Sequence, residues 1–367
     1  MATRRNPRAG RTPAPETSSR KPTSPTRAEL PGTVCSTPTT EPLPGTAKTG
    51  KTVVALEHHR GWGRDILDGE ALGPELSARI KAHLAHHSAE LHFIRRPGRA
   101  GQRHDKNNPT LSLYVAATST SQPTLHRLYI HHPEELLGID LSHPGLHPGA
   151  TQIHHPIMLI CTHGKRDRCC AMYGRPVAAQ LAATFPPDHV WEASHTKGHR
   201  FAPSMLLLPA NYSYGRLDAP AAAVALNLAE RGDLYLPGNR GRGCYDPAGQ
   251  VAEIEVAQLI VENGEVARCA GLSVTACEPT PADHANVAPH AGPSASTTAS
   301  GPATVPGLVA RIVTDTATGR QWRVLLTRDT LTRVVTSCGD APGSQASWRA
   351  RDVRRCTPLR EPLGSST

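Results

Sequence analysis

Short apolar runs separated by polar turns dominate the middle of the chain, and each run has the length of a buried β-strand. Between some of these runs the apolar residues recur at every fourth position, as Leu76, Ile80 and Leu84 do, which predicts helices that pack one face on a sheet. Alternation of strands with helices is typical of an α/β fold. The predicted strands are 53–57, 91–94, 110–116, 128–131, 157–160, 189–192 and 205–208, and helices are predicted from Pro74, Pro176, Asp218 and Gln250.

Three segments lack this pattern and have compositions typical of unpacked chain. Residues 1–33 are rich in Pro, Ser, Thr and Arg and are predicted to be a disordered basic tail. Residues 279–305 consist mainly of Pro, Ala, Ser, Thr and Gly and are predicted to be a linker, and 341–367 a second disordered tail. The patterned sequence is divided into an N-terminal α/β domain (34–155), a second α/β domain (156–278) and a small β meander (306–340) with strands at 308–313, 322–327 and 331–336.

Charge and cysteine content exclude several classes of protein. The formal net charge is +9, but residues 1–30 hold seven Lys and Arg against two Glu, so much of the basicity lies in the predicted tail and no nucleic-acid partner is predicted. No apolar run approaches the ~18 residues that a membrane span requires, so no membrane association is predicted. The nine Cys residues are an odd number and include the adjacent pair Cys169 and Cys170, which does not suit a secreted disulfide framework. The expected location is the reducing cytoplasm.

The segment from Gly45 to Thr52 matches the phosphate-loop formula G-x-x-x-x-G-K-[ST]. A phosphate loop follows a buried strand and leads into a helix, whose N-terminal N–H groups hold the phosphates. Here a Pro-containing stretch precedes the match and the strand-like run from Val53 follows it, so no nucleotide site is predicted. A second glycine-rich stretch, 238–243, has no adjacent apolar strand and is predicted to be a flexible basic loop.

The best candidate for chemistry is the stretch from Cys161 to His199. Cys161 follows the predicted strand 157–160, while His195 and His199 follow the predicted strand 189–192. Residues that follow neighbouring strands can meet at one edge of a sheet. Thiolates and imidazoles are ligands that zinc, copper and iron–sulfur clusters accept, so this stretch predicts a four-ligand metal site.

Spacing distinguishes the kinds of metal site. Eight residues lie between Cys161 and Cys170, whereas a structural zinc knuckle usually has about two to four residues between its thiols. A longer loop suits a larger group, such as a two-iron cluster. Two alternatives remain open: a thiol oxidoreductase that uses the two Cys residues without the histidines, and a zinc-bound structural module. Cys can also be buried simply as a small apolar residue.

A family resemblance bears on this choice. The pattern Cys161-x-His-Gly-x-Arg-Asp-x-Cys-Cys170, followed by His195-x-x-Gly-His199-Arg-Phe-Ala-Pro, resembles the sucrase/ferredoxin-like family. Cys35-Ser36 and Arg240-Gly-Arg-Gly243 also look like blocks of that family. The resemblance implies that residues 156–278 form a thioredoxin-like ferredoxin domain. It further implies a [2Fe–2S] cluster with the ligands Cys161, Cys170, His195 and His199, and with Cys169 as the alternative to Cys170.

The function implied by this resemblance is electron transfer or redox sensing. The chain would then be an electron-transfer protein rather than an enzyme with its own substrate, with an unidentified redox partner and no catalytic residues. The core of an oxidised [2Fe–2S] cluster carries a charge of 2+. Two thiolates make the site neutral, whereas four thiolates would give it a net negative charge. Because an electron is added more easily to a neutral site, the reduction potential is expected to lie above that of an all-Cys ferredoxin.

Overall fold

The computed structural model describes residues 35–36, 41–59, 61–103, 109–119, 121–287 and 304–356. The predicted tail 1–33 lies outside these ranges, as do residues 288–303 of the predicted linker and 357–367 of the second predicted tail. No helix within the described ranges is long and apolar enough to cross a membrane.

Ten strands form one mixed sheet in the order β10-β9-β8-β6-β7-β2-β1-β3-β4-β5. β1 pairs with β2 and β6 pairs with β7 in parallel, and the other neighbours are antiparallel. This large sheet and its helices confirm the predicted α/β class. The strands are β1 (Thr52–Glu57), β2 (Ala89–Arg95), β3 (Leu111–Ala117), β4 (Thr124–Ile130), β5 (Thr151–Ile153), β6 (Ile157–Cys161), β7 (Val190–Ala193), β8 (Ser204–Leu208), β9 (Tyr212–Gly215) and β10 (Asn239–Arg242).

Two halves of this sheet repeat the same order of elements. In each half a helix connects two parallel strands, and an antiparallel pair extends the sheet from the first of them: β1-α1-β2-β3-β4 and β6-α2-β7-β8-β9. The connecting helices are α1 (Pro74–His86) and α2 (Arg168–Thr184). The halves join where β2 pairs with β7. The predicted boundary at residue 155 lies between β5 and β6, so it divides the chain but not the sheet.

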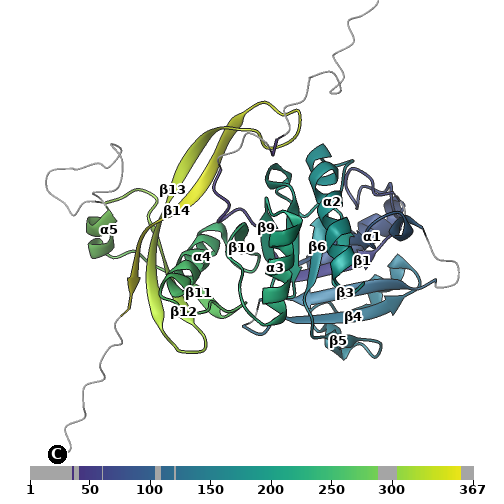
Figure 1. Ribbon diagram of the computed structural model, residues 1–367, viewed down its shortest axis with the longest axis horizontal. Helices are drawn as coiled ribbons and strands as arrows, with labels where there is room; N and C mark the ends of the chain where they lie inside the picture. The colour runs from purple at the N-terminus through teal and green to yellow at the C-terminus, as the bar shows by residue number, and fades with distance from the viewer. Residues whose placement is uncertain are drawn as a thin grey trace, which may run out of the picture. The chain divides into compact units, whose positions relative to one another are not determined.

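The second half carries most of the helical layer. Helices α2 and α3 (Ala219–Glu230) contact each other over this half, and α4 (Pro247–Glu262) contacts both β10 and the strands of a second sheet (Figure 1). One apolar core includes Ile160 of β6, Leu181 of α2 and Val256 of α4. Helix α2 begins earlier than the sequence predicted, at Arg168 instead of Pro176, because the Asp167 side chain caps it by accepting a hydrogen bond from the Cys169 N–H.

The second sheet has four antiparallel strands in the order β11-β12-β13-β14. They are β11 (Leu272–Cys277), β12 (Val309–Asp315), β13 (Gln321–Val334) and β14 (Gly343–Arg355), and the short helix α5 (Pro281–Val287) follows β11. The prediction of a third strand at 331–336 and a disordered tail from 341 was therefore wrong. Strand β14 was not predicted because its sequence is rich in Arg. In the structure Trp348 packs against the core, and Arg349 and Arg351 form ion pairs with Asp329 on β13.

The glycine-rich match to the phosphate loop, from Gly45 to Thr52, leads directly into strand β1. A strand cannot present the helix N-terminus that would hold a phosphate group. The structure therefore confirms the predicted context of this match, which is followed by a strand rather than a helix.

Gly174 allows α2 to lie close to the end of β6. A Cβ atom at this position would lie 2.1 Å from the carbonyl oxygen of Cys161. We expect Gly174→Ala to push α2 away from β6 and to lower the free energy of unfolding by about 1–3 kcal/mol, measured by urea titration. Gly138→Ala is the matched control, because a Cβ atom there has no neighbour within 4 Å. Equal stability of the two variants would contradict the proposed close contact.

Glu253 makes the stability of the core depend on pH. It is fully buried on α4, where it accepts a 2.8 Å hydrogen bond from Tyr212 and faces Arg242, and burial raises the pKa of its carboxyl group from 4.5 to about 7. The folded state thus holds a proton that the unfolded state releases between these pH values. This contribution to stability is complete below pH 4.5 and is lost as the pH rises through 7.

We therefore expect the unfolding free energy of the wild type to fall relative to that of Glu253→Gln as the pH rises from about 5 to 8, by up to about 3 kcal/mol. Gln keeps the shape of the side chain and cannot ionise. Urea titrations at several pH values measure the difference, and Glu262→Gln, at the exposed end of the same helix, is the control. A constant difference between the wild type and Glu253→Gln would show that Glu253 does not titrate in this range.

Candidate metal centre

The ends of β6 and β7 bring a thiol and an imidazole to one edge of the sheet. The two strands are parallel, and Cys161, the last residue of β6, pairs with Ala193, the last residue of β7. His195 follows two residues later, and its Nδ1 atom lies 3.9 Å from the Cys161 Sγ atom. Strand register therefore sets the distance between these two side chains.

The start of α2 supplies the second thiol. The ligand atoms of Cys161, Cys170 and His195 all lie within 4.8 Å of one another. Cys169, the preceding residue, does not belong to this group. Successive residues of a helix are rotated by about 100°, so Cys169 and Cys170 face different surroundings. Of the two alternatives from the sequence, Cys170 is thus the one that lies beside Cys161.

His199 lies on the far side of His195. Its Nδ1 atom is 3.3 Å from the Nε2 atom of His195, and its Nε2 atom is 3.7 Å from an oxygen of Asp167. The turn between the two histidines passes through Lys197 and Gly198, which both have positive φ angles, of 62° and 80°. The four predicted ligand residues thus lie next to one another, with His195 between Cys161 and His199.

Arg240 positions the turn that carries the histidines. Its guanidinium group is buried, donates 3.1 Å hydrogen bonds to the Lys197 carbonyl oxygen and to Ser204, and also donates to Thr46. A Cβ atom on Gly198 would lie 2.4 Å from this guanidinium group, so the turn and Arg240 fit closely only with glycine there.

The prediction that residues 238–243 form a flexible basic loop was wrong. Residues Asn239–Arg242 form strand β10, all four of them buried, at the edge of the ten-stranded sheet. The charges of Arg240 and Arg242 suggested solvent exposure, but both arginines donate hydrogen bonds to backbone carbonyl groups. These bonds offset part of the cost of burying a guanidinium group.

A buried ion pair supports the edge of the sheet beside Cys161. Glu192 of β7 lies 2.9 Å from Arg95 of β2 and accepts a hydrogen bond of 3.1 Å from the hydroxyl group of Thr162. Thr162 directly follows Cys161, so this network holds the chain where it leaves β6. On the histidine side, Arg200 forms a two-bond ion pair with the buried Glu41, at 2.5 and 2.7 Å.

Hydrogen bonding and burial shift the pKa values of Cys161 and Cys170 in opposite directions. Burial opposes ionisation of Cys161, but hydrogen bonds from Cys170 and His195 outweigh it and hold the pKa of Cys161 well below its ordinary value. The hydrogen bond to Cys161, together with burial, raises the pKa of Cys170. Burial also lowers the pKa of His199, which favours the neutral imidazole. Thiolate and neutral imidazole are the forms that bind metals.

A pocket of about 350 Å³ borders the site at His195. Five cationic side chains contribute to its lining against two acidic ones, Asp65 and Glu90. The lining of the pocket beside His195 therefore carries a net positive charge. The cations are Lys48, Arg64, Lys81, Arg166 and Lys197.

Comparison with known proteins identifies a family for this chain. No curated protein and no solved structure matches the chain. The sequence model described as sucrase/ferredoxin-like matches residues 43–229, just over half of the 367 residues. The matched range contains Cys161, Cys170, His195 and His199. The chain belongs to the sucrase/ferredoxin-like family.

Proposed function

We propose that the protein holds a [2Fe–2S] cluster on Cys161, Cys170, His195 and His199 and serves in one-electron transfer or redox sensing. One observation carries the proposal: two thiols and the His195 ring converge within 4.8 Å, with His199 beside His195, in a chain of the sucrase/ferredoxin-like family. When bound, the cluster would supply a one-electron redox couple.

The donor set suits this group on chemical grounds. Cys161 and Cys170 are fully buried, where any net charge is costly. Two thiolates balance the 2+ charge of an oxidised core, and two neutral imidazoles add none. The site would therefore be neutral in its oxidised form, which suits a buried position better than four thiolates would.

The remaining residues would hold the ligands in place and shape access to them. Arg240 fixes the turn between the histidines, and Thr162 and Glu192 fix the end of β6. The pocket beside His195 is the open side, and its cations favour an acidic redox partner. Electron transfer to such a partner is expected to slow as salt concentration rises, and a rate independent of ionic strength would contradict an acidic partner.

A single zinc ion is the second candidate for the same site. Three ligand atoms that all lie within 4.8 Å of one another could also surround one tetrahedral ion. A thiol oxidoreductase is less well supported, because Cys161 is fully buried and a nucleophilic thiolate must reach its substrate.

Anaerobic purification followed by visible spectroscopy and metal analysis tests these candidates. A coloured protein with about two iron and two sulfide per chain, which bleaches on reduction with dithionite, is the expected result. A colourless protein that retains only zinc at this site would overturn the proposal and favour the structural module.

We also propose that the protein works in a reducing compartment, the cytoplasm. All nine Cys residues are free thiols in the structure. Structural disulfides are rare in the cytoplasm and common in secreted proteins. Mapping of unreduced peptides from freshly isolated protein tests this, and a stable intramolecular disulfide would contradict it.

A further inference from the structure

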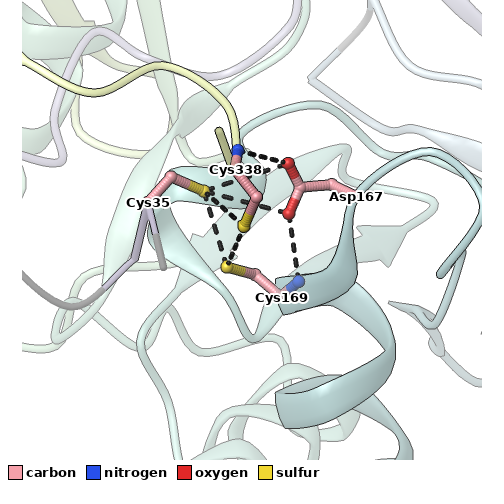
Figure 2. A group of neighbouring side chains, drawn as sticks. All are labelled: Cys35, Asp167, Cys169 and Cys338. Carbon is pink, nitrogen blue, oxygen red and sulfur yellow. Dashed lines mark hydrogen bonds between the residues drawn. The ribbon is translucent and has the colours of Figure 1, made fainter. Parts of the chain in front are cut away.

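Three other cysteines and one aspartate form a second thiol group close to the candidate centre. Its members are Cys35, Cys169, Cys338 and Asp167, and their ligand atoms all lie within 4.8 Å of one another (Figure 2). Cys169 is in the first turn of α2, Cys338 is in the connection between β13 and β14, and Cys35 precedes β1. The sequence separations are 134 residues from Cys35 to Cys169 and 169 residues from Cys169 to Cys338, so only the fold brings these thiols together.

The distances are close to those around one tetrahedral ion. The sulfur atoms of Cys35 and Cys169 are 3.5 Å apart, those of Cys169 and Cys338 are 3.1 Å apart, and those of Cys338 and Cys35 are 3.7 Å apart. Zinc–sulfur bonds of about 2.3 Å in a tetrahedron separate the sulfur atoms by about 3.8 Å. A disulfide would need about 2.05 Å, so none of these pairs is bonded. The three sulfur atoms are therefore at similar distances from one another, as expected for ligands of one ion.

Asp167 adds a buried carboxylate group to the three thiols. Its side chain is 1% exposed, and its oxygens lie 3.9 and 4.0 Å from the sulfur of Cys35. One oxygen accepts the N–H of Cys169, and the other accepts the N–H of Cys338 and the hydroxyl of Ser337, all at 3.0 Å. A buried carboxylate facing three thiols concentrates negative charge once the thiols ionise, and a divalent cation would offset that charge.

Hydrogen bonds also orient the thiols from outside. The hydroxyl group of Ser36 donates to the sulfur of Cys169 over 3.3 Å. Outer hydrogen bonds of this kind fix the direction of ligands in metal sites. The segments that bring in Cys35 and Cys338 thus each add a neighbouring serine, Ser36 and Ser337, that bonds to another member of the group.

We propose that Cys35, Cys169, Cys338 and Asp167 bind a structural Zn²⁺ ion. Thiolates with one carboxylate oxygen are ligands that zinc accepts in closed four-coordinate sites. The adjacent cysteines then serve two different sites: Cys169 binds zinc and Cys170 belongs to the candidate centre. The zinc site does not depend on whether that centre holds a cluster.

The ion would link the segment around Cys35 and the connection between β13 and β14 to the start of α2. Binding energy at a site assembled only in the folded state adds directly to folding stability. Removal of zinc is therefore expected to loosen the segment around Cys338, between β13 and β14, and the segment around Cys35. Faster amide hydrogen exchange at residues 335–342 after chelation would report this loosening.

Elemental analysis of the full-length protein, purified under reducing anaerobic conditions, tests the proposal. We expect about one zinc per chain in the wild type and less than about a tenth of that in Cys35→Ser and Cys338→Ser. Cys356→Ser is the matched control, because Cys356 belongs to neither group, and it should retain its zinc. Iron and sulfide, measured in the same samples, should not change in Cys338→Ser.

Cobalt offers a readout that does not depend on recovering zinc. Co²⁺ added to zinc-depleted wild-type protein should give the intense visible bands of a tetrahedral thiolate site, and these bands should be weak in Cys338→Ser. A circular dichroism spectrum like that of the wild type shows that the variant is folded. Zinc retained in Cys338→Ser but lost in Cys161→Ser, or a Cys169–Cys338 disulfide in place of metal, would overturn the proposal.

Discussion

Cys170→Ser is expected to be purified with almost no iron or sulfide, whereas Cys169→Ser is expected to retain both. The two residues are neighbours at the start of α2, but only Cys170 lies with Cys161 and His195. Serine has nearly the same size as cysteine but is a much weaker ligand for iron, so the change removes one of only two thiolates from the proposed cluster. Iron and sulfide analysis, together with the visible spectrum, measures the difference.

The same two variants are expected to show the opposite pattern in zinc content, which reports on the second thiol group. Cys169→Ser should lose zinc, while Cys170→Ser should retain it, so each variant serves as the folding control for the other. A variant that had simply misfolded would lose both metals. Loss of iron from Cys169→Ser with full retention in Cys170→Ser would instead show that Cys169 is the cluster ligand, and the assignment from the structure would be wrong.

Several strands of the large sheet, such as β1 and β6, could be predicted because they are buried on both faces. Continuous apolar runs such as Ile157 to Ile160 mark such strands without any knowledge of their neighbours. A helix between two predicted strands indicates a parallel pair such as β6 and β7, so the meeting of Cys161 with the residues after β7 could be expected from the local pattern. Arg240 could not be recognised in this way, because its burial depends on partners from two distant segments, at Thr46 and between Lys197 and Ser204.

The second thiol group could not be predicted for a related reason. Cys35 lies just after a stretch of tail-like composition, and Cys338 lies in a connection whose following strand, β14, looked like a charged tail. No short spacing links either residue to Cys169. The sequence did contain one indication, the pair Cys169-Cys170, since two adjacent cysteines cannot easily both reach the same ion.

Replacement of His199 with cysteine is expected to lower the reduction potential of the proposed cluster by on the order of 100 mV or more. The neutral imidazole becomes a thiolate, so the oxidised site gains one negative charge and accepts an electron less readily. The double variant His195→Cys/His199→Cys would have four thiolates and should approach the value of about −400 mV typical of plant-type ferredoxins. Potentiometric titration followed by electron paramagnetic resonance measures both changes.

A His→Cys substitution away from the site is the control for a change in reduction potential that does not depend on cluster ligation. His83→Cys, on α1, replaces a histidine that bonds to the Ile139 carbonyl oxygen, and it should leave the potential unchanged. If His199→Cys retained both its iron and the wild-type potential, His199 would not be a ligand, and its position 3.3 Å from His195 would mark a supporting residue instead. The potential reports on ligand charge directly, so it tests the role of the histidines more sharply than metal content alone, which a neighbouring side chain or water could maintain.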